Sequence, residues 1–429
     1  MNCSYGVTAY SCKWWVIEMA LAGCWQTFTY LKSTASISVQ TVRIVGGSVR
    51  LCTRATADEW EGLQAWRSSS VDERRFWGPK NTCIQPSTFT TSPPLNGSNC
   101  PSTLAEWGAL VLSTSDPHLK ASITHHAFRL WSNHQLSLGT ANAPDRPARP
   151  EKPILVPLKQ VPDVRSSPLP RNAHALHILA HIELNAVDLA WDTVVRFSGH
   201  SHVLGRQFFS DFAHVADDES RHFGWCCQRL SELGCQYGDM PAHDVLVGEG
   251  QKSAKNVMAR LAVVPMVQEA RGLDSGPRLA GRLVGWGDVR SASIVSRIAE
   301  EELAHVAVGV SWFLEVCKMI DRRPDTTFRE LIQDLNVELK GPFNHAARQQ
   351  AGLPRTWYEA DLGSNKVEKL ASDSEIEFGH TRMANGENEI ENNVTINNCD
   401  STDQSRSASL DEVYKRLELL IAMEKERAS

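Results

Sequence analysis

Apolar residues recur at helical spacing through the middle of the chain, and they form one stripe along each of four segments. A stripe with this period predicts an amphipathic helix that buries its apolar face against other helices. About twenty residues separate the second segment from the third, which suits a crossover to the far side of a helical bundle. The four predicted helices cover residues 174–197, 205–233, 252–271 and 288–316.

The sequence before this helical region is less regular. Residues 1–101 show no sustained period, so we expect a poorly ordered extension there. Residues 102–171 begin with two short helices over 103–131, and the second starts at the N-cap Asp116 and at Pro117. They continue as a proline-rich basic strap, which we expect to lie as a solvated tether along the bundle. Contact of this strap with a phosphate backbone is the alternative.

The pattern changes twice toward the C-terminus. Residues 172–362 hold the bundle and a helical flank that is expected to pack back on it. Residues 363–408 are rich in Asn, Ser and Glu and are predicted to be disordered. Residues 409–429 carry leucines at helical spacing, such as Leu410 and Leu417, so an amphipathic helix is expected to dock on the core or on a partner.

Four glutamates fall within the apolar stripes, one on each predicted helix. A carboxylate in a buried stripe costs free energy unless it is paired or bound to a metal. Two of the four begin a Glu-x-x-His sequence, which places a carboxylate and an imidazole on one helix face, a turn apart. A single such pair favours a buried salt bridge, but two pairs and two further glutamates match the ligand set of a di-iron carboxylate bundle. The predicted ligands are Glu183, Glu219, His222, Glu269, Glu302 and His305.

The predicted ligands repeat along the chain. Glu183 and Glu219 are 36 residues apart, and Glu269 and Glu302 are 33 residues apart. These similar spacings predict two similar helix pairs. Mixed carboxylate and imidazole ligands suit iron, with manganese as the alternative. We expect Glu219 and Glu302 to bridge two metal ions, whereas the other two glutamates bind one ion each. A kink at Pro265 is expected to direct Glu269 toward the metal.

The other polar residues beside these ligands are expected to be solvated. On the first predicted helix, the wet face would carry His174, His181, Asp188 and Asp192. Asp217, Asp218, Glu300 and Glu301 are expected to point away from the metal. His243 and Asp244 in the long connection are expected to form a turn, with a place at the mouth of the site as the alternative.

Composition limits the remaining classes of function. The formal net charge of −6 gives no global attraction to nucleic acid or to anionic membranes. The 11 cysteines include no Cys-x-x-Cys, which argues against a disulfide framework or a cysteine zinc site and favours a reducing, cytoplasmic compartment. No apolar stretch is long enough to span a bilayer. Residues 19–57 lack acidic side chains, so an organellar transit peptide is the alternative for the N-terminus.

Several motifs, taken in order, resemble the ferritin-like superfamily, and more narrowly an uncharacterised ferritin-like family classed as a domain of unknown function. They are HILAHIELNAVDLAWD, ADDESRHF, YGDMPAHD, LAVVPMVQEARGLD, EELAHVAVG and KGPFNHAAR, and the resemblance runs from about Thr103 to Leu362. It implies an all-α, ferritin-like four-helix bundle that holds two irons. The ligand pattern is also similar to that of the di-iron tRNA hydroxylase that acts on isopentenylated adenosine beside the anticodon, which implies oxygen-dependent hydroxylation with tRNA as the substrate.

The leading hypothesis is therefore a di-iron oxidoreductase, a monooxygenase that uses dioxygen and an external electron donor. A non-catalytic metal-binding or interaction module of the same fold and an acyl desaturase-like enzyme are the alternatives. A rubrerythrin-type peroxidase is disfavoured because the chain lacks its four-cysteine module. A radical-generating ribonucleotide reductase subunit is disfavoured because no tyrosine lies on the four predicted helices, and a ferritin cage because of the long extensions.

Overall fold

The computed structural model describes residues 15–18, 27–30, 40–45, 48–52, 60–78 and 100–359, together with 415, 417–419 and 422–423. The chain divides into two compact units, residues 1–61 and residues 62–429. The predicted linker at 363–408 lies outside the described residues.

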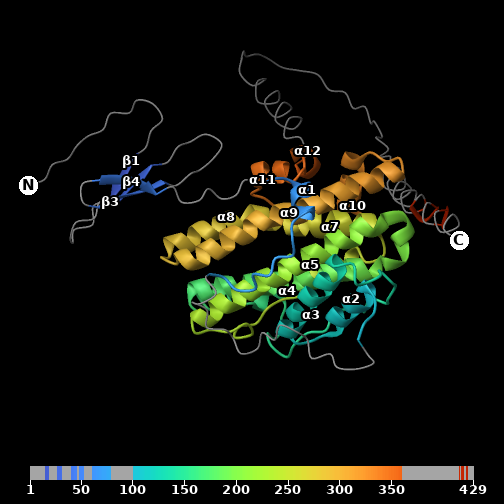
Figure 1. Ribbon diagram of the computed structural model, residues 1–429, viewed down its shortest axis with the longest axis horizontal. Coiled ribbons are helices and arrows are strands. Elements are labelled where there is room, and N and C mark those ends of the chain that lie inside the picture. The colour runs from blue at the N-terminus through green and yellow to red at the C-terminus, as the bar shows by residue number, and fades with distance from the viewer. Residues whose placement is uncertain are drawn as a thin grey trace, which may run out of the picture. The chain divides into compact units, whose positions relative to one another are not determined.

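The first unit contains a four-stranded antiparallel sheet with the strand order β1-β2-β3-β4 (Figure 1). Its strands are β1 Trp15–Glu18, β2 Thr27–Tyr30, β3 Gln40–Val45 and β4 Ser48–Cys52. The sequence did not predict this sheet. Strands of four to six residues are too short for a two-residue alternation to stand out, although the Gly46-Gly47 pair between β3 and β4 is a hairpin signal in the sequence.

The second unit is mostly helical, as predicted (Figure 1). Its longest helices are α4 Arg171–Arg196, α5 Ser201–Glu232, α8 Ala270–Gly285 and α9 Val289–Met319. Shorter helices are α1 Leu63–Arg67, α2 Leu104–Ser113, α3 Pro117–Ser132, α6 Val245–Lys252, α7 Val257–Val263, α10 Pro324–Asp334, α11 His345–Gln350 and α12 Arg355–Tyr358. Among the described residues there are also η1 Leu158–Gln160, η2 Ser198–His200 and the π-helix η3 Val264–Glu269.

Two of the signals at the helix ends act as the sequence predicts. Asp116 is the N-cap of α3, because its side chain accepts a hydrogen bond of 2.7 Å from the Leu119 amide, and Pro117 is the first helical residue. Gly234 follows α5 with a φ of 74°, the left-handed conformation that closes a helix. Gly205, expected to begin the second helix, has a φ of 70° and divides α5 at a kink.

The third predicted helix is longer than expected and is not a regular α-helix throughout. It consists of α7, then η3, then α8, so it continues past Gly272, where the sequence predicted a stop. Gly272 instead lets α8 pack closely against α9, because a Cβ atom at this position would lie 3.3 Å from Cγ of Glu302. Pro265 lies in the π-helix, which ends at Glu269, so the chain is distorted at the predicted place. Gly309 of α9 gives room for this distortion, because a Cβ atom there would lie 2.4 Å from Pro265.

Two long helix pairs surround the core of the second unit. In the first pair α4 packs along α5, and in the second α8 packs along α9 (Figure 1). Contacts of α9 with α5 and with η3 join the pairs. Each of the four predicted ligand segments therefore has another ligand segment beside it.

The predicted wet face of α4 is wrong, because α2, α3 and the proline-rich strap cover it. Asp188 is only 2% exposed and forms ion pairs with Lys120 of α3 and, at 2.7 Å, with Arg149 of the strap. His181 is buried as well, and its Nδ1 lies 2.8 Å from the Tyr237 hydroxyl. Arg149 thus ties the strap to the bundle instead of standing free in solvent. The amphipathic period of a helix shows one buried face, and it cannot show that a second layer covers the other.

A segment from the predicted extension also packs on the bundle. The Arg67 guanidinium is paired with Asp211 of α5 at 2.6 Å, and Arg75 is paired with Asp217 at 2.6 Å. Trp66 donates a hydrogen bond of 3.0 Å to Asp218. Residues 62–78 therefore belong with the helical unit.

Within the described part of the chain, no single helix is long and apolar enough to cross a membrane. Only α9 and α10 taken together would pass on length and composition, and they meet at a bend of 106°.

Candidate metal centre

Buried acidic and imidazole side chains converge between the helix pairs. Glu183 of α4, Glu219 and His222 of α5, and Glu302 of α9 each offer one ligand atom, and these four atoms lie within 4.8 Å of one another. All four residues are at most 4% exposed. Such a group could hold a metal ion.

The other two predicted ligands adjoin this group. Nδ1 of His305 lies 2.8 Å from Oε1 of Glu219 and 3.3 Å from Oε2 of Glu302. Glu269, at the end of η3, lines the same cavity as Glu183 and Glu302, and its pKa responds to the charges of Glu219 and Glu302. The structure therefore brings all six predicted residues to one place.

Glu219 and Glu302 each reach both histidines. The second oxygen of Glu219, Oε2, lies 3.4 Å from Nδ1 of His222, and Oε1 of Glu302 lies 3.9 Å from the same nitrogen. Of the two histidines, Glu183 reaches only His222, whose Nδ1 lies 3.4 Å from Oε2 of Glu183. Glu219 and Glu302 therefore lie between the two histidines, whereas Glu183 lies beside His222.

Several of these buried atoms lack a hydrogen-bond partner. Among the described residues, neither oxygen of Glu219 nor Nδ1 of His222 has a partner of suitable geometry, although ion-pair distances connect them. Buried polar atoms are nearly always satisfied in folded proteins. Carboxylate oxygens and imidazole nitrogens that face a common point are the ligands of first-row transition metals, so this donor set fits such a cation.

The electrostatics of the cluster also favour a cation. Burial raises the pKa of Glu183 and of Glu269 well above the usual range, and the charge of Glu219 raises both further. Burial acts to lower the pKa of His222, but the carboxylates around it outweigh this effect and raise that pKa well above its ordinary value. Four acids thus share one buried space with two imidazoles, and a bound cation would offset their repulsion.

An outer carboxylate faces the far nitrogen of each histidine. Oε2 of Glu301 lies 2.8 Å from Nε2 of His222, and Oδ2 of Asp218 lies 3.4 Å from Nε2 of His305. The Arg221 guanidinium joins these two acids, at 2.8 Å from Asp218 and 2.6 Å from Glu301. A histidine that ligates a metal commonly donates its other N–H to such a partner, which fixes the tautomer and the ring orientation.

The expectation that Asp217, Asp218 and Glu301 point to solvent is wrong. Asp217 and Asp218 are 1% and 3% exposed, and the Glu301 side chain is 11% exposed. Neighbouring residues on a helix point about 100° apart, so Asp218 of α5 can reach His305 of α9 while Glu219 faces the cluster. The signal in the sequence was the acid directly before the Glu of each Glu-x-x-His, but it has this meaning only once α5 and α9 are known to be adjacent.

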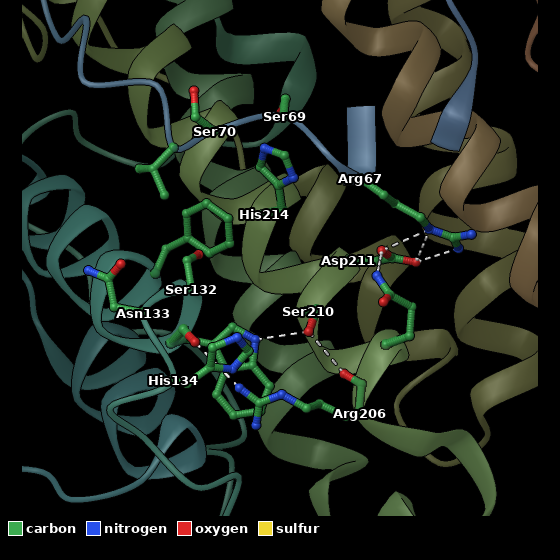
Figure 2. Close-up of a pocket in the computed structure, with 14 residues that line it drawn as sticks. Arg67, Ser69, Ser70, Ser132, Asn133, His134, Arg206, Ser210, Asp211 and His214 are labelled. Carbon is green, nitrogen blue, oxygen red and sulfur yellow. Dashed lines mark hydrogen bonds and ion pairs between the residues drawn. The ribbon is translucent and has the colours of Figure 1, made fainter. Parts of the chain in front are cut away.

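Two hollows lie near the cluster, and three of its glutamates line the smaller one. A cavity of about 190 Å³ is lined by Glu183, Glu269 and Glu302 on the carboxylate side, and His243 also lines it. His243 thus lines this cavity, as its alternative expected, and it also accepts a local hydrogen bond of 3.3 Å from the Val245 amide. On the histidine side lies a larger hollow of about 420 Å³, lined by residues that include Arg67, Arg206, Ser210 and His214 (Figure 2).

A chain of contacts connects this larger hollow with the cluster. The His214 ring, labelled in Figure 2, stacks on Trp66 with ring centroids 3.9 Å apart and on Phe128 at 4.8 Å. The Trp66 indole N–H bonds to the same Asp218 oxygen that lies 3.4 Å from His305. This connection could not be predicted from the sequence, because Trp66 lies in a stretch without a helical period.

Comparison with known proteins places the chain in a family. The family described as "Protein of unknown function (DUF455)" matches residues 113–359, more than half of the chain and including all six predicted ligands. An "Uncharacterized protein" of Haemophilus influenzae (strain ATCC 51907 / DSM 11121 / KW20 / Rd) is 37% identical over 218 residues, which cover 50% of this chain and 75% of that relative. No solved structure matches the chain. The chain therefore belongs to the DUF455 family.

Proposed function

We propose that this protein is a di-iron oxidoreductase, a monooxygenase built on a ferritin-like four-helix bundle. The observation that carries the proposal is the buried set of four carboxylates and two imidazoles, with unsatisfied atoms at its centre. Four helices supply it in the order of the ligand set of di-iron bundles: a Glu, a Glu-x-x-His, a Glu and a second Glu-x-x-His.

Each residue has a defined task in this proposal. Glu219 and Glu302 would be shared between the two irons, Glu183 and Glu269 would each hold one, and the histidines would bind through Nδ1. The outer acids Glu301 and Asp218 hold Nε2 of His222 and His305, so that each Nδ1 is presented to the metal without its proton. Two irons in such a site supply the binding and reduction of dioxygen.

The surrounding residues keep bulk water from the centre and leave one side accessible. The histidines and Glu219 are fully or almost fully buried, whereas the three remaining glutamates line the cavity of about 190 Å³. A substrate would therefore approach from the carboxylate side. Hydroxylation places one oxygen atom in a C–H bond and reduces the other to water, so an external donor must supply two electrons and two protons.

The histidine side is the side from which electrons would arrive. His214 and Trp66 join the larger hollow to Asp218, and Asp218 lies against His305. The stacked rings and the hydrogen bond form a continuous contact between the surface and a predicted ligand. An electron donor bound at this hollow would leave the substrate cavity free.

The test begins with purified full-length protein that is loaded with ferrous iron without oxygen. We expect two irons per chain, and an absorption change when oxygen is admitted. In Glu219→Ala and in Glu302→Ala the iron content should fall and the absorption change should disappear. Circular dichroism and thermal unfolding of the same samples report whether the fold survives.

Glu300→Ala is the matched control, because Glu300 lies on α9 beside the ligands but pairs with Arg297 at the surface. It should bind iron like the wild type. Fewer than two irons per chain, or no response to oxygen, would refute the di-iron oxidoreductase. Iron binding without any response to oxygen would leave a metal-binding module. A comparison of modified nucleosides in tRNA from knockout and wild-type cells would test tRNA as the substrate.

A further inference from the structure

The cavity on the carboxylate side has a lining that indicates what enters it. Its walls come from α4, α8, α9, the end of η3 and residues around His243 at the start of α6. Glu183, Glu269 and Glu302 lie along it, and its described lining includes neither His222 nor His305. A group inside the cavity would therefore meet the carboxylate face of the cluster.

Aliphatic side chains line the cavity from the interior to the solvent. Val295 and Ile298 of α9 are buried beside the ligands. Ile182 and Val245, which also line the cavity, are each 41% exposed although they are large apolar residues. Exposed aliphatic side chains that continue a buried apolar wall are typical of the entrance of a ligand site.

Positive charge is confined to the rim. Arg271 is the one lysine or arginine among the described residues of the lining, and it is exposed, with its guanidinium bonded to the Glu338 carbonyl at 3.0 Å. Burial lowers the pKa of His243, so that imidazole is neutral near pH 7. The described walls also hold the polar side chains of Gln268 and Ser275, but apart from the centre they hold no charged group in the interior that would compensate a charge carried deep into the cavity.

We propose that this cavity receives an uncharged aliphatic group of the substrate, and that the polar part of the substrate stays at the rim beside Arg271. An apolar cavity of about 150 Å³ holds a six-carbon ring, so about 190 Å³ has room for roughly six to eight carbons. This inference rests on the proposed function and adds the class of substrate to it. The oxidised bond is an aliphatic C–H bond next to the centre, and dioxygen and the external donor balance the reaction.

The first experiment uses straight-chain 1-alkanols from butanol to decanol as probes of iron-loaded, full-length protein. Each methylene that enters the cavity should tighten binding about fourfold. The gain should level off at about six to eight carbons, where the cavity is full. Adipate and 1,6-hexanediammonium carry a charge at both ends, so one charge must enter, and both should bind at least tenfold more weakly than 1-hexanol.

Three variants locate the binding. Ile182→Ser should weaken hexanol several-fold, and Val245→Ser repeats this test at a second exposed position. Ile298→Ala lengthens the cavity, so the levelling point should move to longer chains by about one or two carbons. Leu314→Ser is the matched control, because Leu314 on α9 is 42% exposed and does not line the cavity; it should bind like the wild type.

The outcomes separate this inference from the proposed function. No saturable binding, no dependence on chain length, or equal binding of the doubly charged probes would overturn the substrate class. The same would follow if Leu314→Ser weakened binding as much as Ile182→Ser. Iron content is measured on the same samples: alkanol binding without iron uptake would refute the di-iron centre and leave the aliphatic cavity, whereas iron uptake without alkanol binding would refute the cavity alone.

Discussion

His222 of α5 lies 2.8 Å from Glu301 of α9 through its Nε2, while its Nδ1 faces Glu183 and Glu219. One imidazole therefore connects the inner carboxylates with an outer one on another helix. Asp218 and His305 repeat the relationship in the opposite direction, from α5 to α9. The two Glu-x-x-His helices thus orient each other's histidines, and Arg221 holds the two outer acids together.

Removing the charge of an outer acid should weaken metal binding and leave the fold intact. In Glu301→Gln, His222 loses its carboxylate acceptor, so its ring is held less firmly and is a weaker base. We expect iron affinity to fall about 10- to 100-fold, as for outer partners in other metal sites. Competition with a chelator measures the affinity. Glu300→Gln is the control, and equal iron affinity in both variants would contradict the role of Glu301.

Gly272→Ala should separate stability from metal binding. Alanine in a helix is more favourable than glycine by about 1 kcal/mol. The added Cβ would lie 3.3 Å from Cγ of Glu302, so this carboxylate must shift. We expect an unfolding free energy that is unchanged or higher, together with a lower iron content. Gly281→Ala, at a position of the same helix with open space around the added atom, should keep the iron. Normal iron content in Gly272→Ala would show that Glu302 tolerates the shift.

Trp66→Phe should slow electron delivery without emptying the centre. It removes the indole N–H that bonds to Asp218, beside His305. We expect normal iron content but slower reduction of the ferric protein by an external reductant, followed by absorbance in stopped flow. Trp312→Phe is a matched control, because Trp312 also donates to a buried acid, Asp211 at 2.7 Å, away from His305. Equal reduction rates in all three proteins would exclude the route through Trp66.

Asp288 should stabilise the fold in a pH-dependent way. It is the N-cap of α9 and also accepts hydrogen bonds from Asn172 and Arg229. Burial acts to raise its pKa, but hydrogen bonds from Ser291 and Asn172 and the charge of Arg229 lower it to about 2. Because this pKa lies below the unfolded value of 3.8, the charge stabilises the fold fully above about pH 4, and the effect is lost as the pH falls toward 2.

Asp288→Asn should therefore cost about 2 kcal/mol of unfolding free energy at pH 7, and the difference from wild type should shrink below pH 4. Urea unfolding at pH 7, 5, 4 and 3 gives the comparison. Glu315→Gln on the same helix controls for the loss of one negative charge. A difference that stayed constant from pH 7 to pH 3 would show that the asparagine loses packing or capping rather than charge.

Helix periodicity alone located the four ligand segments and the six residues that meet in the structure. A helix keeps residues at i and i+3 on one face whatever surrounds it, so Glu219 with His222 and Glu302 with His305 could be paired without coordinates. The caps at Asp116 and Gly234 were readable for the same reason, since their chemistry is local.

Only the tertiary structure decided which distant segments of the chain are in contact. Glu301 and Asp218 became partners of the histidines because α5 and α9 lie together, and Asp188 became buried because the strap and α3 cover α4. Trp66 joined the centre from more than a hundred residues away in the sequence. A sequence carries the period of each helix, but which faces meet depends on how all the helices pack at once, and that is why the outer residues of the centre appear only in three dimensions.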